Sequence, residues 1–526
     1  MKSKNSLRWL VICITGITLA LSSWAVSSPV ASGPDDDFHL ASIWCGQGVR
    51  DGLCEEGSKP GSYLVPSTVV NNAFCFAFQE NNSGFCPQTN DLVETSRVNL
   101  RSNHYPAVYY WTMSWLATED VTSSVITMRL MNSAIAVSLL SVIVVLLPVQ
   151  LRRIPIVSFA ATLVPLGMFV IASTNPSGSG LVSIIAFFSA VLGLLTAKTL
   201  GRRIAFLALS GISFLLGAGA REDSAAYLIF SAGLAWFITS KYKSSSRANV
   251  FIVAGVSLSA ILFLALAYSS DSFLGYFLRG ANWWDQETTL GGTVRNIITL
   301  PDLWVGAFGY WALGWLDTPL PSSVWAVSFS IFAILIFGAV RHFSRRQSFA
   351  VLAVVLALVF VPMYTLAVNG LLVGQIVQPR YLLPLLALLV ATSMFRGTVE
   401  SGLDASRGQL TILGLGLVAA NAISLHTNLR RYLTGLDENQ VSLNFEIEWW
   451  WFERPSADAF LWPSPNYVWV IGFTAFALFL FSLWKLRDEV GLSPSSSDAR
   501  YQVPAELENT TKLPNNPASK SPNPSG

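Results

Sequence analysis

The chain has 526 residues, of which 52% are hydrophobic and only 12% are charged, and its formal net charge is +2. This small number of charged side chains cannot cover the surface of a soluble globular protein of this length. The composition therefore predicts an integral membrane protein. Lys and Arg lie mainly in short loops between apolar segments, whereas most acidic residues lie in a few longer loops. This pattern is typical of membrane topology and argues against nucleic-acid binding.

The N-terminal segment begins with basic residues and continues as an apolar stretch from about residue 9 to residue 26. Signal peptides and uncleaved first membrane helices share this arrangement. We favour an uncleaved helix because an acidic cluster follows so closely, and cleavage near residues 23 to 25 is the alternative. On either interpretation, the chain from residue 30 onward begins outside the cytoplasm.

Residues 29–124 form the first predicted extracytoplasmic loop, and they contain Cys45, Cys54, Cys75 and Cys86. An even number of cysteines in one polar loop predicts two disulfides in an oxidising compartment, with three pairings open. A zinc site is the alternative, although the loop has no CxxC spacing.

Eleven further apolar segments follow the first one, and they bring the predicted number of membrane helices to 12. They lie at about residues 125–149, 154–173, 181–199, 204–219, 225–240, 249–269, 322–340, 348–368, 381–396, 409–425 and 466–485. The predicted fold is an all-α, multi-pass membrane domain over residues 1–490, with further extracytoplasmic loops at 270–321 and 426–465. Residues 491–526, rich in Ser, Pro and Asn, are expected to form a disordered cytoplasmic tail.

The charges of the short loops predict the orientation of these helices. With a cytoplasmic N-terminus, every basic pair in a short loop falls on the cytoplasmic side, as the positive-inside rule requires. Both termini are then cytoplasmic. The same alternation places five segments on the outer side together with the cysteine loop: Asn175–Gly178, Arg221–Asp223, 270–321, Gln378–Arg380 and 426–465.

An acidic cluster of Asp35, Asp36 and Asp37, followed by His39, comes directly after the first apolar segment. If a helix begins here, an acid three or four residues before His39 shares a face with it. A carboxylate could then take a proton from an acceptor hydroxyl, and Asp36 with Asp37 could hold a divalent cation. The structural alternative is helix capping, with Pro34 at the first helical position and acids in the first turn.

Arg221 and Arg380 are predicted at the outer ends of membrane helices. Both could anchor their helices at the interface, and Glu222 and Asp223 could neutralise Arg221. The alternative is phosphate recognition, because a guanidinium offers paired donors and stabilises charge on a phosphate leaving group. The centres of the predicted spans are almost free of ionisable residues, which favours a site at the outer surface over an ion-coupled transport path.

The outer loops are rich in Trp and Tyr, most of which are typical of the membrane interface. A minority could stack on a sugar or line a groove for an isoprenoid chain. Five short motifs also occur in one order: Pro34-Asp35-Asp36 with His39, Tyr105–Tyr110, Asn175–Gly178, Gly314–Pro321 and Gln378–Pro384.

In this order the motifs resemble the family catalogued as domain of unknown function 2142, bacterial multi-pass membrane proteins similar to the C-type glycosyltransferases. The resemblance covers about residues 9 to 485. It implies a helical fold in a bacterial plasma membrane, an acidic catalytic residue in the first outer loop, and a polyprenyl-phosphate-linked sugar as donor. By position, Asp35 or Asp36 would be the base and Arg380 would bind the donor phosphate. The further substrate-binding candidates are His39, Tyr105, Arg221, Asp317 and Tyr381.

Two positions depart from the family pattern. Asp36 and Asp37 stand where an Asp-Glu pair is usual, which leaves open which acid acts. Pro379 stands where a glycine is expected before Arg380, and proline removes an amide donor and fixes its dihedral angle.

The expected function is that of an inverting transferase that moves a sugar from the lipid-linked donor to a cell-surface glycan or glycolipid, with membrane lipid as a further partner. The sequence identifies no cofactor beyond a divalent cation at the acidic cluster. The alternatives are a carrier or flippase for lipid-linked sugars and a non-catalytic cell-envelope assembly protein.

Overall fold

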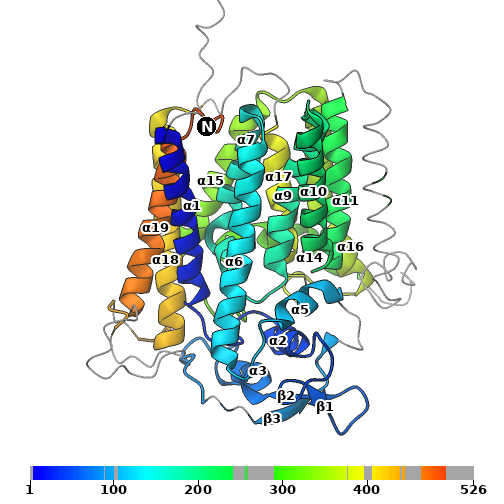
Figure 1. Ribbon diagram of the computed structural model, residues 1–526, viewed down its shortest axis with the longest axis vertical. Helices are drawn as coiled ribbons and strands as arrows, with labels where there is room; N and C mark the ends of the chain where they lie inside the picture. Colours follow the sequence, from blue (N-terminus) through cyan, green and yellow to red (C-terminus); the bar gives the residue numbers. More distant parts are fainter. Residues whose placement is uncertain are drawn as a thin grey trace, which may run out of the picture.

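Long helices run side by side through most of the structure, and short helices and strands cover one end of them (Figure 1). The computed structural model describes residues 4–87, 89, 91–99, 105–240, 255, 258, 289–375, 377–395, 405–438, 441–444 and 464–492. We call the covered end the loop end; it contains the described residues of the segment 26–120, which follows the first helix. The first helix begins at the opposite end of the bundle (Figure 1).

Within the described residues, nine helices are long and apolar enough to cross a membrane. One of them is kinked: α7 (Val149–Thr162) is followed by η2 (Leu163–Gly167), in which Val164 has non-helical backbone angles, and by α8 (Met168–Ile171). The other eight are α1 (Lys4–Ala25), α6 (Val121–Leu146), α9 (Ser177–Thr196), α10 (Leu200–Ala218), α15 (Ser322–Val340), α16 (Arg345–Val368), α18 (Arg407–Leu433) and α19 (Pro465–Lys485).

Two more of the predicted segments are also helical. α11 (Glu222–Thr239) begins with two acidic residues, and α17 (Pro379–Ser393) is apolar but has only 15 residues. The remaining segment, 249–269, lies almost entirely outside the described residues. The number 12 therefore stays a prediction, as does the tail at 491–526, most of which is also outside the described residues.

Local sequence signals explain where several helices begin. The side chain of Asp120 caps α6 by accepting a hydrogen bond from the Ser123 backbone N–H at 3.0 Å. Ser406 and Gln409 form a capping box at the start of α18. Pro379 occupies the first turn of α17, where its missing amide leaves no donor unpaired.

α9 lies at the centre of the bundle, because α6, α7, α10, α11 and α17 all pack against it. Nearly all of its side chains are buried. Small residues allow this close packing: a Cβ on Gly193 would lie 2.5 Å from the ring of Phe206 in α10. The central position of α9 fixes its first residues at the loop end, beside the start of α11.

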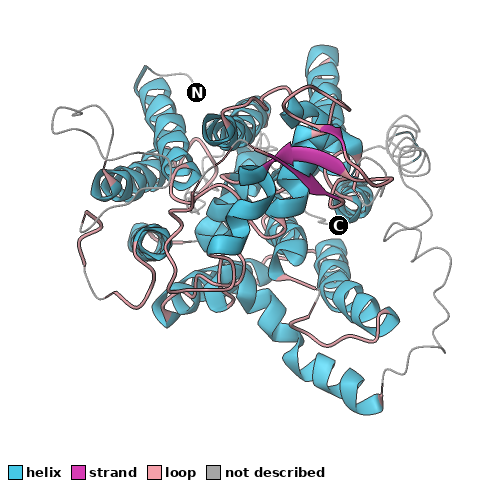
Figure 2. Cartoon of the chain, turned by 90° about the horizontal axis from the view of Figure 1, so that it is seen from below, coloured by secondary structure: helices cyan, strands magenta, loops and turns pink. Residues whose placement is uncertain are grey.

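The loop end contains α2 (Asp36–Trp44), β1 (Glu55–Glu56), β2 (Tyr63–Pro66), α3 (Ser67–Asn71), η1 (Asn72–Cys75), β3 (Leu92–Thr95) and α5 (Ala107–Ser114). Figure 2 looks onto this end, with the strands in front of the helices. The sheet is antiparallel with β2 in the middle, where Tyr63 pairs with Glu56 on one side and Thr95 on the other. Strands this short give no clear alternating pattern, so none was predicted. The fold is mostly α rather than all-α.

The four cysteines of the first loop form two disulfides, Cys45–Cys54 and Cys75–Cys86. This confirms the predicted disulfides and selects one of the three pairings. The zinc alternative is wrong, because all four thiols are used. Each disulfide joins residues close in sequence, so each closes a local turn of the loop.

Two predicted outer loops contain more helix than the sequence indicated. Within 270–321, α14 (Leu290–Val305) is followed by a π-helical turn, η4 (Gly306–Tyr310). α14 packs against α16 and α17, and its buried residues Asn296, Leu300 and Leu303 have the spacing of one helix face. α18 continues to Leu433 and so includes the start of the loop predicted at 426–465.

Candidate functional site

Asp35 and Arg380 meet at the loop end, although 345 positions separate them in the chain. Arg380 Nη2 lies 2.6 Å from Asp35 Oδ2. The side chain of Arg380 is 2% exposed, whereas that of Asp35 is 40% exposed. The pair therefore combines a buried guanidinium with a carboxylate that solvent can reach.

The backbone before α2 directs Asp35 toward Arg380. Asp35 has a φ of 60°, a left-handed conformation that Asp tolerates better than most residues. It occupies the N-cap of α2, but its carboxylate makes no capping hydrogen bond. Asn175 Nδ2 holds the preceding residue by donating to the carbonyl of Pro34 at 2.9 Å. Because Asp35 is the N-cap, Pro34 lies outside the helix, and the prediction that it occupies the first helical position is wrong.

Arg380 has hydrogen-bonding capacity that its neighbours do not use. Its Nη2 also donates to Tyr381 Oη at 3.0 Å. Its Nε and Nη1 are buried, and in the part of the chain that the structure describes they have no hydrogen-bond partner. Buried donors without partners are costly, so a site that leaves two of them on one guanidinium is suited to an anion.

The ring of Tyr381 lies between two arginines. Its centroid is 5.0 Å from Arg380 Cζ and 4.5 Å from Arg221 Cζ, distances at which a cation and an aromatic face attract each other. Arg221 donates two hydrogen bonds of 2.9 and 2.8 Å to the Asp223 carboxylate, so of the two acidic residues predicted to neutralise Arg221, these contacts involve Asp223. The ring centroid of Tyr105 lies 5.7 Å from Arg221 Cζ.

Cavities of different polarity border this cluster. One of about 190 Å³ is lined by charged, hydroxyl and apolar groups of α11, α16 and α17, together with Tyr105. A smaller one, of about 20 Å³, is formed by Arg380 and mostly apolar residues between η2, η4 and the turn after η4. Tyr381 borders the first cavity and Arg380 borders the second.

His39 belongs to the aromatic wall of the site. Its Nδ1 lies 2.8 Å from Tyr110 Oη, and its ring packs edge-on against Tyr105. Burial lowers the pKa of His39 to about 3, so the imidazole is neutral at ordinary pH. Asp35 is the N-cap of α2, and its carbonyl oxygen accepts a hydrogen bond from the His39 N–H at 2.9 Å. The two residues therefore lie one helical turn apart, as their spacing predicts, but their side chains bind different partners.

Asp36 and Asp37 have other partners. Asp36 is fully buried and accepts hydrogen bonds from the Gly33 N–H at 2.8 Å and from Thr174 Oγ1 at 3.2 Å. Asp37 forms an ion pair with Arg97, with 2.7 Å between Nε and Oδ2. Among the described residues, no group of three or more His, Cys, Asp or Glu side chains is placed to hold a metal ion. The proposed Asp36–Asp37 cation site thus lacks a donor cluster there.

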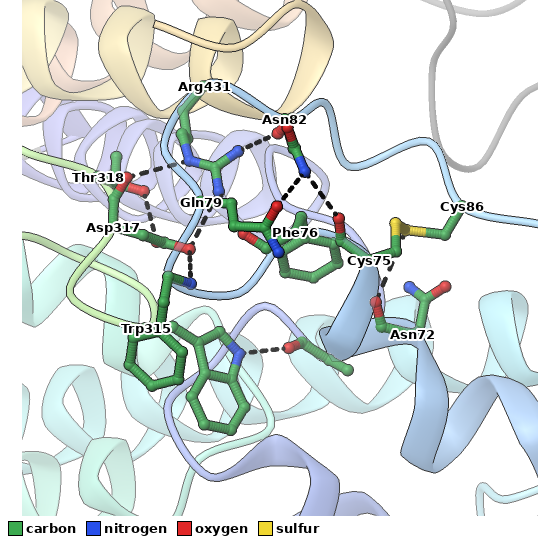
Figure 3. A network of polar contacts seen from close by, with 12 residues as sticks. Asn72, Cys75, Phe76, Gln79, Asn82, Cys86, Trp315, Asp317, Thr318 and Arg431 are labelled. Atoms are coloured by element: carbon green, nitrogen blue, oxygen red, sulfur yellow. Dashed lines mark hydrogen bonds and ion pairs between the residues drawn. A yellow bond between two sulfur atoms is a disulfide. The ribbon is translucent and has the colours of Figure 1, made fainter.

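Asp317 lies in a buried network instead of the cluster around Arg380 (Figure 3). Its Oδ2 accepts hydrogen bonds from Arg431 Nη2 at 3.0 Å and from the Phe78 N–H at 3.2 Å. Arg431 also donates to the carbonyl oxygens of Phe76 and Asn82. These contacts fasten the turn closed by the Cys75–Cys86 disulfide to α18, which indicates a structural role for Asp317.

The sequence analysis did not indicate two buried arginines of the loop end. Arg431 is one, and Arg129 of α6 is the other. Arg129 Nη1 donates to the carbonyl of Ser28 at 2.5 Å, and Nη2 donates to that of Pro29 at 2.8 Å. Arg129 therefore holds the segment that leads from α1 to Asp35. The available signal was a single arginine inside an apolar segment, which is costly unless it has partners.

The comparison with known protein families gives a match to most of the chain. A family model described as "Predicted membrane protein (DUF2142)" matches residues 19–389. The matched range includes Asp35, Arg221 and Arg380, but it ends before α18 and Arg431. No curated protein and no solved structure matches the chain.

Proposed function

The chain belongs to the DUF2142 family of predicted membrane proteins, and we propose that it is a glycosyltransferase whose active site is the Asp35–Arg380 cluster at the loop end. The donor is a polyprenyl-phosphate-linked sugar, and the acceptor is a hydroxyl of a cell-envelope glycan or glycolipid. In this proposal the loop end faces outward from a bacterial plasma membrane. The two disulfides of the loop support that orientation, because disulfides persist in oxidising compartments.

The observation that supports this function best is the hydrogen-bonding state of Arg380. Its Nε and Nη1 are buried and have no hydrogen-bond partner among the described residues, while Nη2 of the same planar group binds a solvent-accessible carboxylate. A phosphate group accepts such paired donors well, and its charge is stabilised strongly where water is excluded. Asp35 then lies beside the bond to be broken.

The proposed reaction is a single displacement. The acceptor hydroxyl gives its proton to the Asp35 carboxylate while its oxygen forms a bond to the anomeric carbon of the sugar. The bond between that carbon and the phosphate oxygen breaks, and the electron pair leaves on the phosphate, where Arg380 stabilises the charge. Attack from the face opposite the phosphate inverts the anomeric configuration.

Phosphate binding would also activate the base. Burial alone would raise the pKa of Asp35, but the Arg380 guanidinium 2.6 Å away outweighs it, so the pKa lies below its ordinary value. Asp35 is therefore a weak base while it is the partner of Arg380. A donor phosphate that takes over this guanidinium releases the carboxylate and raises its basicity. Proton abstraction is thus linked to the presence of the donor.

The test compares Asp35→Asn with the wild type in membrane vesicles that receive labelled polyprenyl-phosphate sugars and a panel of glycan acceptors. Asn tolerates the left-handed backbone of position 35 but cannot accept the proton, so transfer should fall about 100- to 10,000-fold. The matched control is Asp51→Asn, which changes an exposed aspartate of the same loop and should leave transfer unchanged.

Undiminished transfer by Asp35→Asn would refute the mechanism. If no donor yields a transferred sugar while labelled lipid crosses the bilayer, the protein is a carrier. If neither event occurs with any donor or acceptor, a non-catalytic assembly role replaces the proposal.

A further inference from the structure

We infer that an exposed patch beside Asp35, formed by Phe78, Trp315 and Leu316, binds a sugar ring of the acceptor. We call these three residues the acceptor patch. The inference rests on the proposed function and deepens it, because it gives the acceptor a binding surface and makes it a saccharide rather than a simple alcohol.

The acceptor patch presents apolar side chains to solvent. Phe78 is 72% exposed and Leu316 is 41% exposed, while Trp315 is half-buried. The rings of Phe78 and Trp315 meet edge to face, with 5.5 Å between their centroids. An aromatic ring offers a flat apolar face on which the C–H groups of a pyranose can pack. The patch therefore has the kind of surface that a sugar ring needs.

Trp315 connects the acceptor patch to the proposed base. Its Nε1 donates a hydrogen bond of 2.9 Å to the carbonyl of Ala31, in the segment that leads to Asp35 (Figure 3). Leu316 and Arg380 border the same small cavity. The patch is thus continuous with the Asp35–Arg380 pair, and the carboxylate of Asp35 is reached from solvent. An acceptor that packs on the patch can present a hydroxyl to that carboxylate.

The backbone of the patch is held in a costly conformation. Among the described residues, those other than glycine with a positive φ are Ala31, Asp35, Phe78 and Leu316. Left-handed backbone is unfavourable for side chains as large as Phe and Leu, so the surrounding structure must maintain it. At Phe78 the backbone N–H donates to Asp317 Oδ2 at 3.2 Å, within the buried network described above. A ring fixed in solvent at this cost is suited to stacking on a bound group.

The residues after Phe78 favour a glycan over the membrane as the group that covers the patch. Gln79, Glu80, Asn81 and Asn82 are all exposed. Insertion of the patch into lipid would remove water from these polar side chains, which is costly. Amide groups can instead donate to and accept from hydroxyl groups. An aromatic ring bordered by amides therefore complements both the apolar face and the hydroxyl edge of a sugar.

The first experiment measures transfer in membrane vesicles from a labelled polyprenyl-phosphate sugar to oligosaccharides released from bacterial surface polysaccharides. Phe78→Ala should raise the acceptor KM about tenfold and leave kcat and the donor KM unchanged, because stacking holds the acceptor equally before and during the reaction. Phe78→Trp keeps an aromatic face and should retain the wild-type KM. Phe74→Ala is the matched control, because Phe74 is 70% exposed on η1 of the same turn.

The second experiment measures binding without catalysis. The full chain in lipid nanodiscs is applied to an array of the same oligosaccharides, and an environment-sensitive fluorophore is attached to the Glu80→Cys variant, at an exposed position next to the patch. Without oligosaccharide, its emission should be that of a group in water. An oligosaccharide retained by the array should shift the emission to shorter wavelength, and Phe78→Ala should weaken this binding about tenfold.

The outcomes separate the acceptor patch from the proposed function. If Phe78→Ala keeps the wild-type acceptor KM and glycan binding while Asp35→Asn loses transfer, the patch is not the acceptor site and the proposed function stands. Emission typical of lipid before any oligosaccharide is added would assign the patch to the membrane, and a wild type that binds no oligosaccharide would also overturn the inference. If oligosaccharides bind through Phe78 but no sugar is transferred, the proposed function fails and the patch remains a glycan-binding surface.

Discussion

At the scale of single residues, three consecutive aspartates acquire three different roles. Asp35 faces Arg380 and remains accessible, Asp36 is enclosed, and Asp37 forms an ion pair with Arg97. The side chains are identical, so the difference comes from the backbone. The left-handed conformation of Asp35 separates its carboxylate from the helix that begins at Asp36. Asp35 is consequently the better candidate for the base.

The enclosed carboxyl group of Asp36 should make stability depend on pH. Burial raises the pKa of Asp36 from its ordinary 3.8 to about 6, so the folded protein holds this proton more tightly than the unfolded chain does. The stabilising contribution is complete below pH 3.8 and is lost as the pH rises through about 6. Asp36→Asn removes this titration and should flatten the dependence of the unfolding temperature on pH between 4 and 6, within the window set by these pKa values.

The measurement is thermal unfolding of purified protein in detergent at several pH values across that window. Asp51→Asn, at an exposed position, should keep the wild-type profile. Asp35 does not contribute to the pH dependence in this window, because its pKa is lowered and it titrates below the window. An Asp36→Asn profile as steep as that of the wild type would show that another group titrates.

The sequence named Asp35 and Arg380 as candidate site residues, and the structure brings them together, but the sequence did not indicate the arginines that hold the loop end together. Asp35 and Arg380 lie in short polar motifs at the ends of helices. Such motifs stand out from the apolar segments beside them, so the sequence alone indicates candidate functional residues there. Arg129 and Arg431 bind mainly backbone carbonyl oxygens, as the bonds to Ser28 and Phe76 show. Every residue has a carbonyl group, so such partners leave no trace in the sequence.

At the scale of elements, hydropathy located the described membrane helices to within several residues, because each is a long apolar run. It failed for β1, β2 and β3, whose two to four residues give no period, and for α14. α14 contains Pro301 and is apolar on one face only, so its sequence resembles a loop until α16 and α17 provide a surface for that face.

The turn closed by Cys75 and Cys86 should depend on the ion pair that fastens it to α18. Arg431 and Asp317 have side chains that are 0% and 1% exposed. Arg431→Gln leaves the Asp317 carboxylate buried without its cation, which should lower the free energy of unfolding by about 3–5 kcal/mol. Limited proteolysis should then cut the turn faster than in the wild type.

Arg430→Gln provides the matched control, because it removes an arginine from the adjacent position of α18 without touching Asp317. Asp317→Asn combined with Arg431→Gln should recover part of the loss, since it removes both charges. A stability of Arg431→Gln equal to that of the control would mean that the backbone hydrogen bonds, and not the ion pair, hold the turn.

At the scale of the whole molecule, the predicted alternation of helix direction across the membrane placed at one end the segments that meet there in the structure. Hydrogen bonds join Thr174 to Asp36, Arg221 to Ser177 and Arg380 to Asp35, and all of these residues come from segments predicted on the same side. Alternation fixes the end at which a loop lies but not its lateral neighbours. Which arginine meets which aspartate depends on helix packing around α9, and the sequence does not state that packing.

The same alternation predicts the side of the membrane that the loop end faces. Basic residues gather at the opposite ends of the helices, for example in the connections between α9 and α10 and between α15 and α16. These connections should stay in the cytoplasm, because the positive-inside rule opposes their translocation. We therefore expect Ser58→Cys, at an exposed position of the loop end, to react with a membrane-impermeant maleimide in intact cells.

Arg202→Cys, exposed in the first turn of α10, should react only after the cells are made permeable. The native Cys13 is buried and the other four cysteines form disulfides, so the background labelling of the wild type should be low. The reverse pattern would place Asp35 and Arg380 in the cytoplasm. A donor displayed on the outer leaflet could not then reach Arg380, and the disulfides would have to persist in a reducing compartment, so both the orientation and the proposed acceptor would be refuted.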